Sequence, residues 1–176
     1  MLKSVLSYLD SCDKAIDLEH LRRLMSDIDV SLEELRPFVA FSDNGYQRNL
    51  VKQGAQYELL VLCWRSGQAS RIHDHDGSSC CFKILQGEAT ETNFQLTGRT
   101  LDGEKLVKPI GSKPYQVGTV CASTSSHIHK ISNETEGSLI TLHCYSPALH
   151  MNTYLIDPIW AASAKPNHCM VASLKV

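Results

Sequence analysis

The sequence predicts a mainly β protein, a single barrel or sandwich preceded by a small layer of helices. Apolar residues recur at helical spacing over the first forty residues, and short β-rich segments separated by turn residues fill most of the remainder. The length of 176 residues suits one domain with a substantial core. We therefore expect a single domain over 1–176, with a helical layer at 1–40 and a barrel with C-terminal strands at 41–176.

The N-terminal layer is expected to contain three helices. The first two are predicted from apolar residues that share one helix face, in the groups Leu2, Val5, Leu6 and Leu9, and Leu21, Leu24, Met25 and Ile28. In "SLEEL", Ser31 and Glu34 have the spacing of a capping box, which predicts a short third helix. Pro37 is expected to end it.

Short strands are expected to make up the body of the protein. Seven segments are rich in β-branched and aromatic residues and are bounded by Gly, Asp, Asn, Ser or Pro. They are "YELLVLCW" at 57–64, "CCFKILQG" at 80–87, "EATETNFQL" at 88–96, "YQVGTVCAS" at 115–123, "HIHKIS" at 127–132, "SLITLHCYS" at 138–146 and "MNTYLID" at 151–157. Asp102-Gly103 is a two-residue hairpin signal. Many short strands at close spacing favour a sandwich or barrel.

Composition and charge indicate neither nucleic acid nor membrane as a partner. The formal net charge is −2, with no basic block, and no apolar run is long enough to span a bilayer. The N-terminal stretch turns acidic early and is a poor secretion signal, so we expect a cytoplasmic monomer. Seven cysteines at irregular spacing, without a CxxC, are typical of reduced, buried thiols, and we expect this of Cys12, Cys63, Cys121, Cys144 and Cys169.

Two histidines separated by one residue, His73 and His75, are the first indication of a metal site. On a strand they would point to the same face, because side chains alternate with a period of two. Taken alone, the pair is more typical of an incidental surface pair in a chain with eight histidines. The surrounding spacing is more specific, and reads G-x5-HxH-x4-C-x6-G from Gly67 to Gly87.

A second block, G-x5-T-x-S-x2-H-x3-N, runs from Gly118 to Asn133. The two blocks resemble the paired metal-binding motifs of the cupin superfamily, with Cys80 in place of the usual Glu, and Thr124 and Ser126 in place of the usual Pro and Gly. This resemblance implies a single cupin-type β-barrel, or jelly-roll. Neutral imidazoles suit Fe, Zn, Cu or Ni about equally, so the ligand type alone does not name the metal.

The third ligand of such a site is expected to be His129. His127 and His129 share a face by alternation, but only His129 precedes Asn133 at the motif spacing. We therefore expect His127 to be a neighbour of the site. Three other histidines, His20, His150 and His168, lie outside the motifs and are expected at the surface.

A larger part of the chain is similar to one branch of the cupins. From about Leu35 to about Pro147, the chain resembles the cysteine dioxygenase family in "YQRNLV", "LLVLCW", "IHDHDGSSC", "KILQGEATET", "HKISN" and "LHCYSP", in the same order and with similar intervals. The resemblance implies a β-barrel with N-terminal helices and one non-haem Fe(II) per chain. It also implies that both atoms of O₂ are added to the sulfur of L-cysteine, which gives cysteine sulfinate.

The family's site residues transfer to matching positions of this chain. The resemblance implies that His73, His75 and His129 bind the iron. It implies that Arg48 pairs with the substrate carboxylate beside Tyr46, which suits the two parallel hydrogen bonds that a guanidinium can donate. Without this likeness, Arg48 would be assigned to a solvated strand edge.

The same resemblance places Tyr145 near the iron and makes Cys80 the cysteine that some members join to that tyrosine by a thioether. His143 belongs to a Ser-x-His-x-Tyr set that supports the tyrosine, and here Thr141 replaces the serine. Because a hydroxyl is kept, we expect the same hydrogen bond. Alternation places Thr141, His143 and Tyr145 on one face of their strand.

Strand alternation also decides between the two adjacent cysteines. Cys80 shares its face with Phe82 and Ile84, whereas Cys81 shares its face with Lys83. The face with the lysine is expected to point outward, so Cys80 is expected inside the barrel and Cys81 outside its wall.

Three other functions remain open at this stage. A dioxygenase for 3-mercaptopropionate or another small thiol is the nearest alternative, although Arg48 together with Cys80 favours cysteine. A non-catalytic metal-binding cupin is the second. The third is a zinc site that activates water at the same histidines.

Overall fold

The computed structural model describes residues 2–164, and its N-terminal layer contains the expected helices. They are α1 (Leu2–Asp10), α2 (Leu18–Asp27) and α3 (Leu32–Leu35), and a 3₁₀ turn, η1 (Arg36–Phe38), follows them. The capping box is confirmed: the Ser31 hydroxyl accepts from the Glu34 amide, and the Glu34 carboxylate accepts from the Ser31 amide. Pro37 lies in η1, where α3 has already ended.

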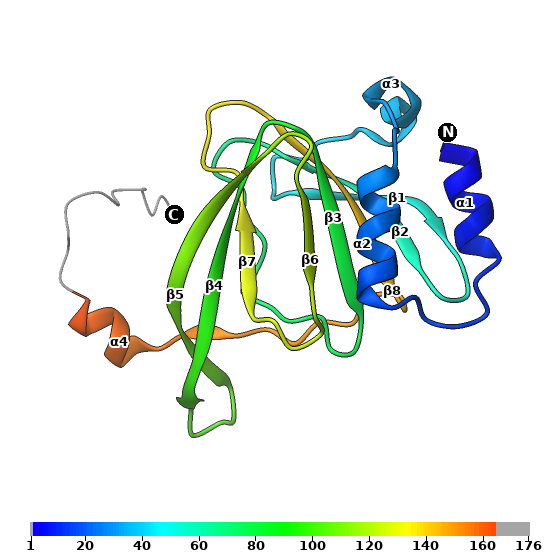
Figure 1. Cartoon of the computed structure of the whole chain (residues 1–176). Helices are drawn as coiled ribbons and strands as arrows, with labels where there is room; N and C mark the ends of the chain where they lie inside the picture. The colour runs from blue at the N-terminus through cyan, green and yellow to red at the C-terminus, as the bar shows by residue number, and fades with distance from the viewer. Residues whose placement is uncertain (1, 165–176) are drawn as a thin grey trace.

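The body of the protein consists of two curled sheets (Figure 1). The strands are β1 (Gln47–Gln53), β2 (Glu58–Trp64), β3 (Ser79–Gln86), β4 (Glu88–Arg99), β5 (Lys105–Gln116), β6 (Val120–Ser123), β7 (His129–Ser132), β8 (Leu139–Ser146) and β9 (Leu155–Ile156). One sheet has the order β1-β2-β8-β3-β6, and the other has the order β7-β4-β5-β9. Every pairing is antiparallel except that of β5 with β9. The two sheets together form the barrel around the site described below.

All seven predicted segments contain strand residues, but β1 and the first ten residues of β5 lie outside them. β1 reads "QRNLVKQ", which is too polar to be recognised as a strand. β5 contains Pro109 and Pro114 and is largely exposed. The predicted hairpin between β4 and β5 is present, but its turn is not the expected two-residue one. The Gly103 amide donates to the Thr100 carbonyl, so Leu101 and Asp102 are the central residues, and Gly103 follows with a φ of +89°.

Among the described residues, the C-terminal part contains less strand than expected. Within "MNTYLID" only Leu155 and Ile156 form a strand, and the helix α4 (Pro158–Ser163) follows directly. The Asp157 side chain accepts hydrogen bonds from two amides of the first turn, and Pro158 stands at the start of the helix. This pairing of an N-cap with a following proline is typical of a helix start.

Alternation divides the core between the two faces of the larger sheet. Toward the helices lie buried residues that include Leu59, Val61, Cys63, Cys81, Leu142 and Cys144. Toward the barrel interior lie residues that include Leu60, Leu62, Trp64, Cys80, Phe82, Ile84 and Tyr145. The helical layer therefore covers the outer face of this sheet and leaves its inner face for the site.

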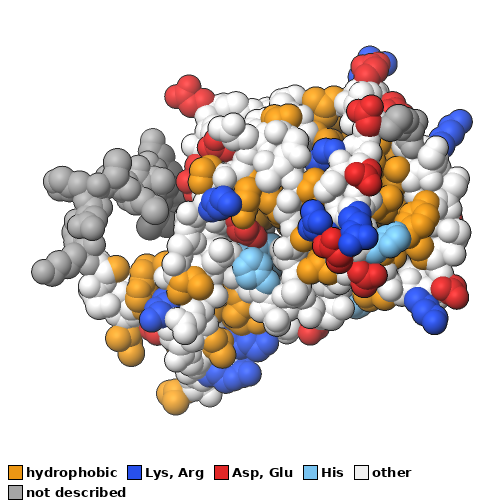
Figure 2. All heavy atoms as spheres, in the orientation of Figure 1, with side chains coloured by type: hydrophobic (Ala, Val, Ile, Leu, Met, Phe, Trp, Pro, Cys, Tyr) orange, Lys and Arg blue, Asp and Glu red, His pale blue; other side chains and the backbone are white. Residues whose placement is uncertain are grey.

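Lys83 links the outer face of the larger sheet to the helix α2. Its ammonium group donates to the backbone carbonyls of Ser26 (3.2 Å) and Ile28 (2.7 Å) at the end of α2. Its stem thus remains outside the barrel, as expected. The solvent side of α2 carries charged side chains of both signs (Figure 2), including the ion pairs of Glu19 with Arg22 and Arg23.

The surface histidines and the cysteines largely follow the sequence expectations. His20 and His150 are exposed, and His168 lies outside the described residues. Cys63, Cys121 and Cys144 are buried free thiols, whereas Cys12 is only half-buried, and Cys169 lies outside the described residues. Among residues 2–164, no helix has the length and apolarity needed to cross a bilayer.

Candidate metal centre

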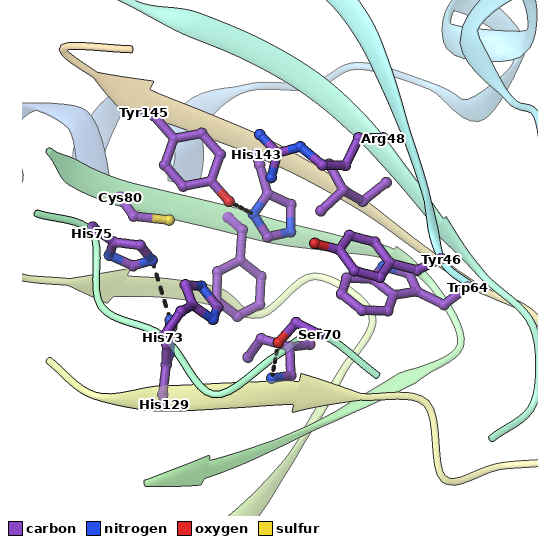
Figure 3. A pocket seen from close by; sticks show the side chains of 13 residues that line it. Tyr46, Arg48, Trp64, Ser70, His73, His75, Cys80, His129, His143 and Tyr145 are labelled. Atoms are coloured by element: carbon purple, nitrogen blue, oxygen red, sulfur yellow. Dashed lines mark hydrogen bonds between the residues drawn. The ribbon is translucent and has the colours of Figure 1, made fainter. Parts of the chain in front are cut away.

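The side chains of His73, His75 and His129 converge inside the barrel (Figure 3). The ring centroids are 5.3 Å apart for His73 and His75, 4.8 Å for His73 and His129, and 4.9 Å for His75 and His129. All three residues are buried, and each offers one nitrogen within 4.8 Å of the others. This arrangement is a candidate metal centre formed by three imidazoles.

The local structure that positions two of these histidines differs from the expectation. His73 and His75 lie between β2 and β3, not on a regular strand. His73 forms a single bridge with His129, with backbone N–H to O distances of 2.9 Å in both directions. The His75 amide donates to the Ser125 carbonyl. The loop is thus held against β7 by backbone hydrogen bonds, and these bring the rings together.

The protonation of the imidazoles suits metal binding. Burial, followed by the charge of His129, lowers the pKa of His73 to about 4 and that of His75 to about 3, so both are neutral at pH 7. His129 donates its Nδ1 proton to Glu91, and its Nε2 faces the Nε2 of His75 at 3.1 Å. Lone pairs that converge in this way are stabilised by a cation between them. The residues present therefore fit a divalent transition-metal ion.

The three histidines form one side of a small pocket, in which a water-sized group has about 10 Å³ of free space for its centre. Part of its wall is apolar and contains Leu62, Phe82 and Ile131. Tyr46 lines the mouth and stacks on Trp64 with the ring centroids 4.1 Å apart. A pocket that combines apolar side chains with a few converging polar groups is typical of a small-molecule site.

Arg48 lies on the opposite side of the pocket from the histidines (Figure 3). Its Nη2 donates to Glu58 Oε1 at 3.0 Å, and the guanidinium carbon lies 5.6 Å from the centroid of the Tyr145 ring. Although burial opposes its charge, neighbouring Tyr145, Tyr46 and Glu58 raise its pKa, so it stays protonated. Glu58 was missed from the sequence, but alternation with Leu60 and Leu62 could have placed it on the inner face.

A hydrogen-bonded chain positions Tyr145. Trp64 Nε1 donates to Thr141 Oγ1 (3.2 Å), which lies 2.9 Å from His143 Nε2, and His143 Nδ1 lies 3.0 Å from the Tyr145 hydroxyl. A hydroxyl has one proton and two lone pairs, so Thr141 can accept from Trp64 and still either donate to His143 or accept from it. In both cases the chain holds the Tyr145 hydroxyl at the wall of the pocket.

Burial keeps His143 neutral by holding its pKa well below the usual value. The hydrogen bond expected for Thr141 in place of serine is present. Trp64, the first donor of the chain, was not anticipated.

The inward and outward faces of the two cysteines are as expected. Cys80 is the direct cross-strand partner of Tyr145 in the pairing of β3 with β8, and it lines the pocket. Cys81 is the partner of Cys144 and packs beneath the helices. Burial raises the pKa of Cys80 and of Tyr145 well above the usual values, so both are protonated.

Two further side chains lie behind His129. Glu91 Oε1 accepts from His129 Nδ1 at 2.6 Å, and Tyr115 donates to Glu91 Oε2 at 3.1 Å. Glu91 was not anticipated from the sequence. His127 is half-buried, and its ring centroid is 5.1 Å from that of His129, so it is a neighbour of the candidate ligands.

Two solved structures share the fold at low sequence identity. A protein of Klebsiella pneumoniae with a double-stranded β-helix domain aligns over 69% of this chain and 94% of its own, with 14% identity and a TM-score of 0.55. Oxalate decarboxylase of Bacillus subtilis aligns over 68% of this chain and 30% of its own, with 13% identity and a TM-score of 0.51. These likenesses confirm the expected fold class and carry no functional conclusion.

Sequence relatives are more informative. The zebrafish protein named cysteine dioxygenase type 1 is 36% identical over 138 residues, which cover 76% of this chain and 67% of its own. The human protein of the same name is 31% identical over 135 residues, which cover 75% of this chain and 66% of its own. The matched region thus spans about two thirds of these relatives. The model of the family described as cysteine dioxygenase type I matches residues 5–154. The chain belongs to the cysteine dioxygenase type I family.

Proposed function

We propose that this protein is a non-haem iron dioxygenase that converts L-cysteine and O₂ into cysteine sulfinate. The observation that carries the proposal is the joint placement of three buried imidazoles, Arg48 and Tyr145 around one small pocket. Membership of the cysteine dioxygenase family supports the same reaction.

One Fe(II) per chain is proposed as the cofactor, held by His73, His75 and His129. When bound, the ion would supply positions for a thiolate and O₂ at one centre. The protein's own part is to keep His73 and His75 neutral by burial and to line part of the pocket with apolar side chains. Desolvation strengthens the electrostatic contacts that orient a substrate within the pocket.

Arg48 is proposed to orient the substrate by its carboxylate. The guanidinium is a rigid fork of N–H donors that binds a carboxylate at two points, and it lies across the pocket from the histidines. Tyr46 would border the bound substrate at the mouth. Tyr145, whose hydroxyl is held in place by its hydrogen bond with His143, would contact groups of the substrate or of O₂.

A thioether between Cys80 and Tyr145 is proposed to form during turnover. Their strands are paired in register at these two residues, so the thiol starts beside the phenol ring. Forming the bond removes the S–H hydrogen and one ring C–H hydrogen, and O₂ is the oxidant that takes up the two electrons and two protons. The alternative, in which the bond does not form, leaves both side chains in place.

We also propose that the protein acts as a cytoplasmic monomer, with L-cysteine and O₂ as its reactants. The free thiols of Cys12, Cys63, Cys80, Cys81, Cys121 and Cys144 fit a reducing compartment. No nucleic acid or membrane is proposed as a partner, since the chain has a small negative net charge.

A thiol panel tests the proposed function. The iron-loaded protein should consume oxygen with L-cysteine, and the product mass should be that of the sulfinate. 3-Mercaptopropionate is the second candidate, because it also has a thiol and a carboxylate, although Arg48 together with Cys80 favours cysteine. If it is oxidised faster than cysteine, the substrate assignment is wrong. If no thiol is oxidised, the non-catalytic binding function or the zinc site takes precedence, and metal analysis of protein purified without chelators separates these two.

A further inference from the structure

The three candidate metal ligands differ in what their outer ring nitrogens contact. His73 Nδ1 lies 2.8 Å from the backbone carbonyl of Arg71. His129 Nδ1 lies 2.6 Å from a carboxylate oxygen of Glu91. His75 Nδ1 is buried and has no hydrogen-bond partner among the described residues. Of these two contacts, only that of His129 is to a charged group.

Glu91 lies in the barrel interior as a consequence of strand alternation and register. It shares its face of β4 with Ala89, which belongs to the inner core cluster. β4 pairs with β7, where Asn93 is opposite His129 and Glu91 is opposite Ile131. Glu91 and His129 are therefore diagonal neighbours on adjacent strands, a separation that a long side chain can bridge.

The carboxylate is fixed from its other side as well. Tyr115, on β5, donates its hydroxyl proton to Glu91 Oε2 at 3.1 Å. Glu91 is 5% exposed, so solvent does not compete for its oxygens. A buried carboxylate with two protein donors has one orientation, and that orientation faces His129 Nδ1.

We propose that Glu91 is a positioning residue for the metal, which it serves by holding the proton of His129 on Nδ1. An ionised carboxylate can only accept, so the Nε2 lone pair of His129 is left for the ion. The negative charge also makes that nitrogen a stronger donor than one backed by a backbone carbonyl. Glu91 is thus expected to set the affinity of the site without touching the metal.

A second group, formed by Glu91, His127 and His129, could also hold an ion by itself. The hydrogen bond between Glu91 and His129 Nδ1 uses the atoms that such a site would need. Our proposal therefore requires one metal ion per chain.

The test measures Co(II) binding, which reports metal affinity through visible absorption and does not depend on turnover. In Glu91→Gln, where a neutral amide replaces the charge, the Co(II) dissociation constant should rise about 10–100-fold. Glu91→Leu, which removes the hydrogen bond, should weaken binding further, and the Co(II) bands should shift in both variants. Tyr115→Phe should have a smaller effect. Glu88→Gln is the matched control, because Glu88 lies on the same strand and is bonded to Gln116 away from the histidines.

Thermal unfolding of the metal-free variants separates positioning from a structural role. The proposal is supported if Glu91→Gln unfolds near the parent midpoint and still binds Co(II) weakly. It is overturned if the affinity and bands match those of Glu88→Gln, or if the parent binds a second Co(II) that Glu91→Gln loses. The inference rests on the proposed metal site, but not on the reaction. If the parent protein binds Co(II) as described but does not oxidise cysteine when loaded with iron, the proposed function is wrong and the role of Glu91 at the metal site still stands.

Discussion

Replacing Arg48 by alanine tests how the substrate is recognised. The guanidinium lies inside the pocket with its side chain 29% exposed, and its partner Glu58 is 16% exposed. Removing one member of a fully buried ion pair costs on the order of 3–5 kcal/mol, and an exposed pair contributes under about 1 kcal/mol. For a substrate carboxylate in this partly exposed site we expect a loss of about 3 kcal/mol, which corresponds to roughly a 100-fold fall in kcat/KM for L-cysteine.

The assay is oxygen uptake by iron-loaded protein with L-cysteine and with cysteamine, which has the thiol and the amine but no carboxylate. Arg48→Ala should lower kcat/KM for L-cysteine and leave the weak rate with cysteamine near the parent value. Arg65→Ala is the matched control, because Arg65 forms an ion pair with Asp43 at the surface. An equal fall for both thiols, or no fall for cysteine, would refute carboxylate recognition by Arg48.

The same variant leaves Glu58 without its cation, which adds a measurable effect on stability. Arg48→Ala should therefore lower the free energy of unfolding by about 1–3 kcal/mol, between the values for exposed and buried pairs. The double variant Arg48→Ala/Glu58→Gln should recover part of this loss, because it removes the unpaired charge. The free energies of unfolding are measured by urea denaturation of the metal-free proteins. If the loss in the double variant equals the sum of the losses in the two single variants, the two side chains are not coupled.

Two further predictions concern the metal and the cross-link. His129→Ala should lose bound iron and turnover, because it removes one of three protein ligands, whereas His127→Ala should keep its iron and its turnover. If His129→Ala keeps iron and His127→Ala loses it, His127 is the third ligand. After incubation with iron, cysteine and air, peptide mapping should find Cys80 joined to Tyr145. The cross-linked peptide should be absent in Cys80→Ser and present in Cys81→Ser, and the reverse pattern would show that the wrong thiol was chosen.

Residues whose position depends on alternation were placed well from the sequence. The inward thiol of Cys80, the outward thiol of Cys81 and the shared face of Thr141, His143 and Tyr145 follow from the two-residue period of a strand. His73 and His75 converge as predicted, but the predicted cause was wrong. They were expected on a strand, whereas in the structure they lie in a loop that backbone hydrogen bonds hold against β7.

Residues whose role depends on a distant partner could not be found in this way. Glu58 and Glu91 are acidic residues within strands, and nothing local in the sequence shows which cation or imidazole each will meet. Their partners are set by the folding of the strands around the pocket, and for Glu91 by the register of β4 with β7. The hairpin signal indicated a strand after Gly103, but most of β5 was not among the predicted segments. Its prolines are unfavourable in central strands, and they are tolerated here because much of this strand is exposed.

The central claim is that both atoms of O₂ are added to the sulfur of L-cysteine. Turnover of iron-loaded protein under ¹⁸O₂, followed by mass spectrometry of the product, tests this directly. We predict cysteine sulfinate that carries two labelled oxygen atoms, formed in proportion to the oxygen consumed. A product with one labelled atom, cystine as the main product, or no oxygen uptake at all would contradict the account.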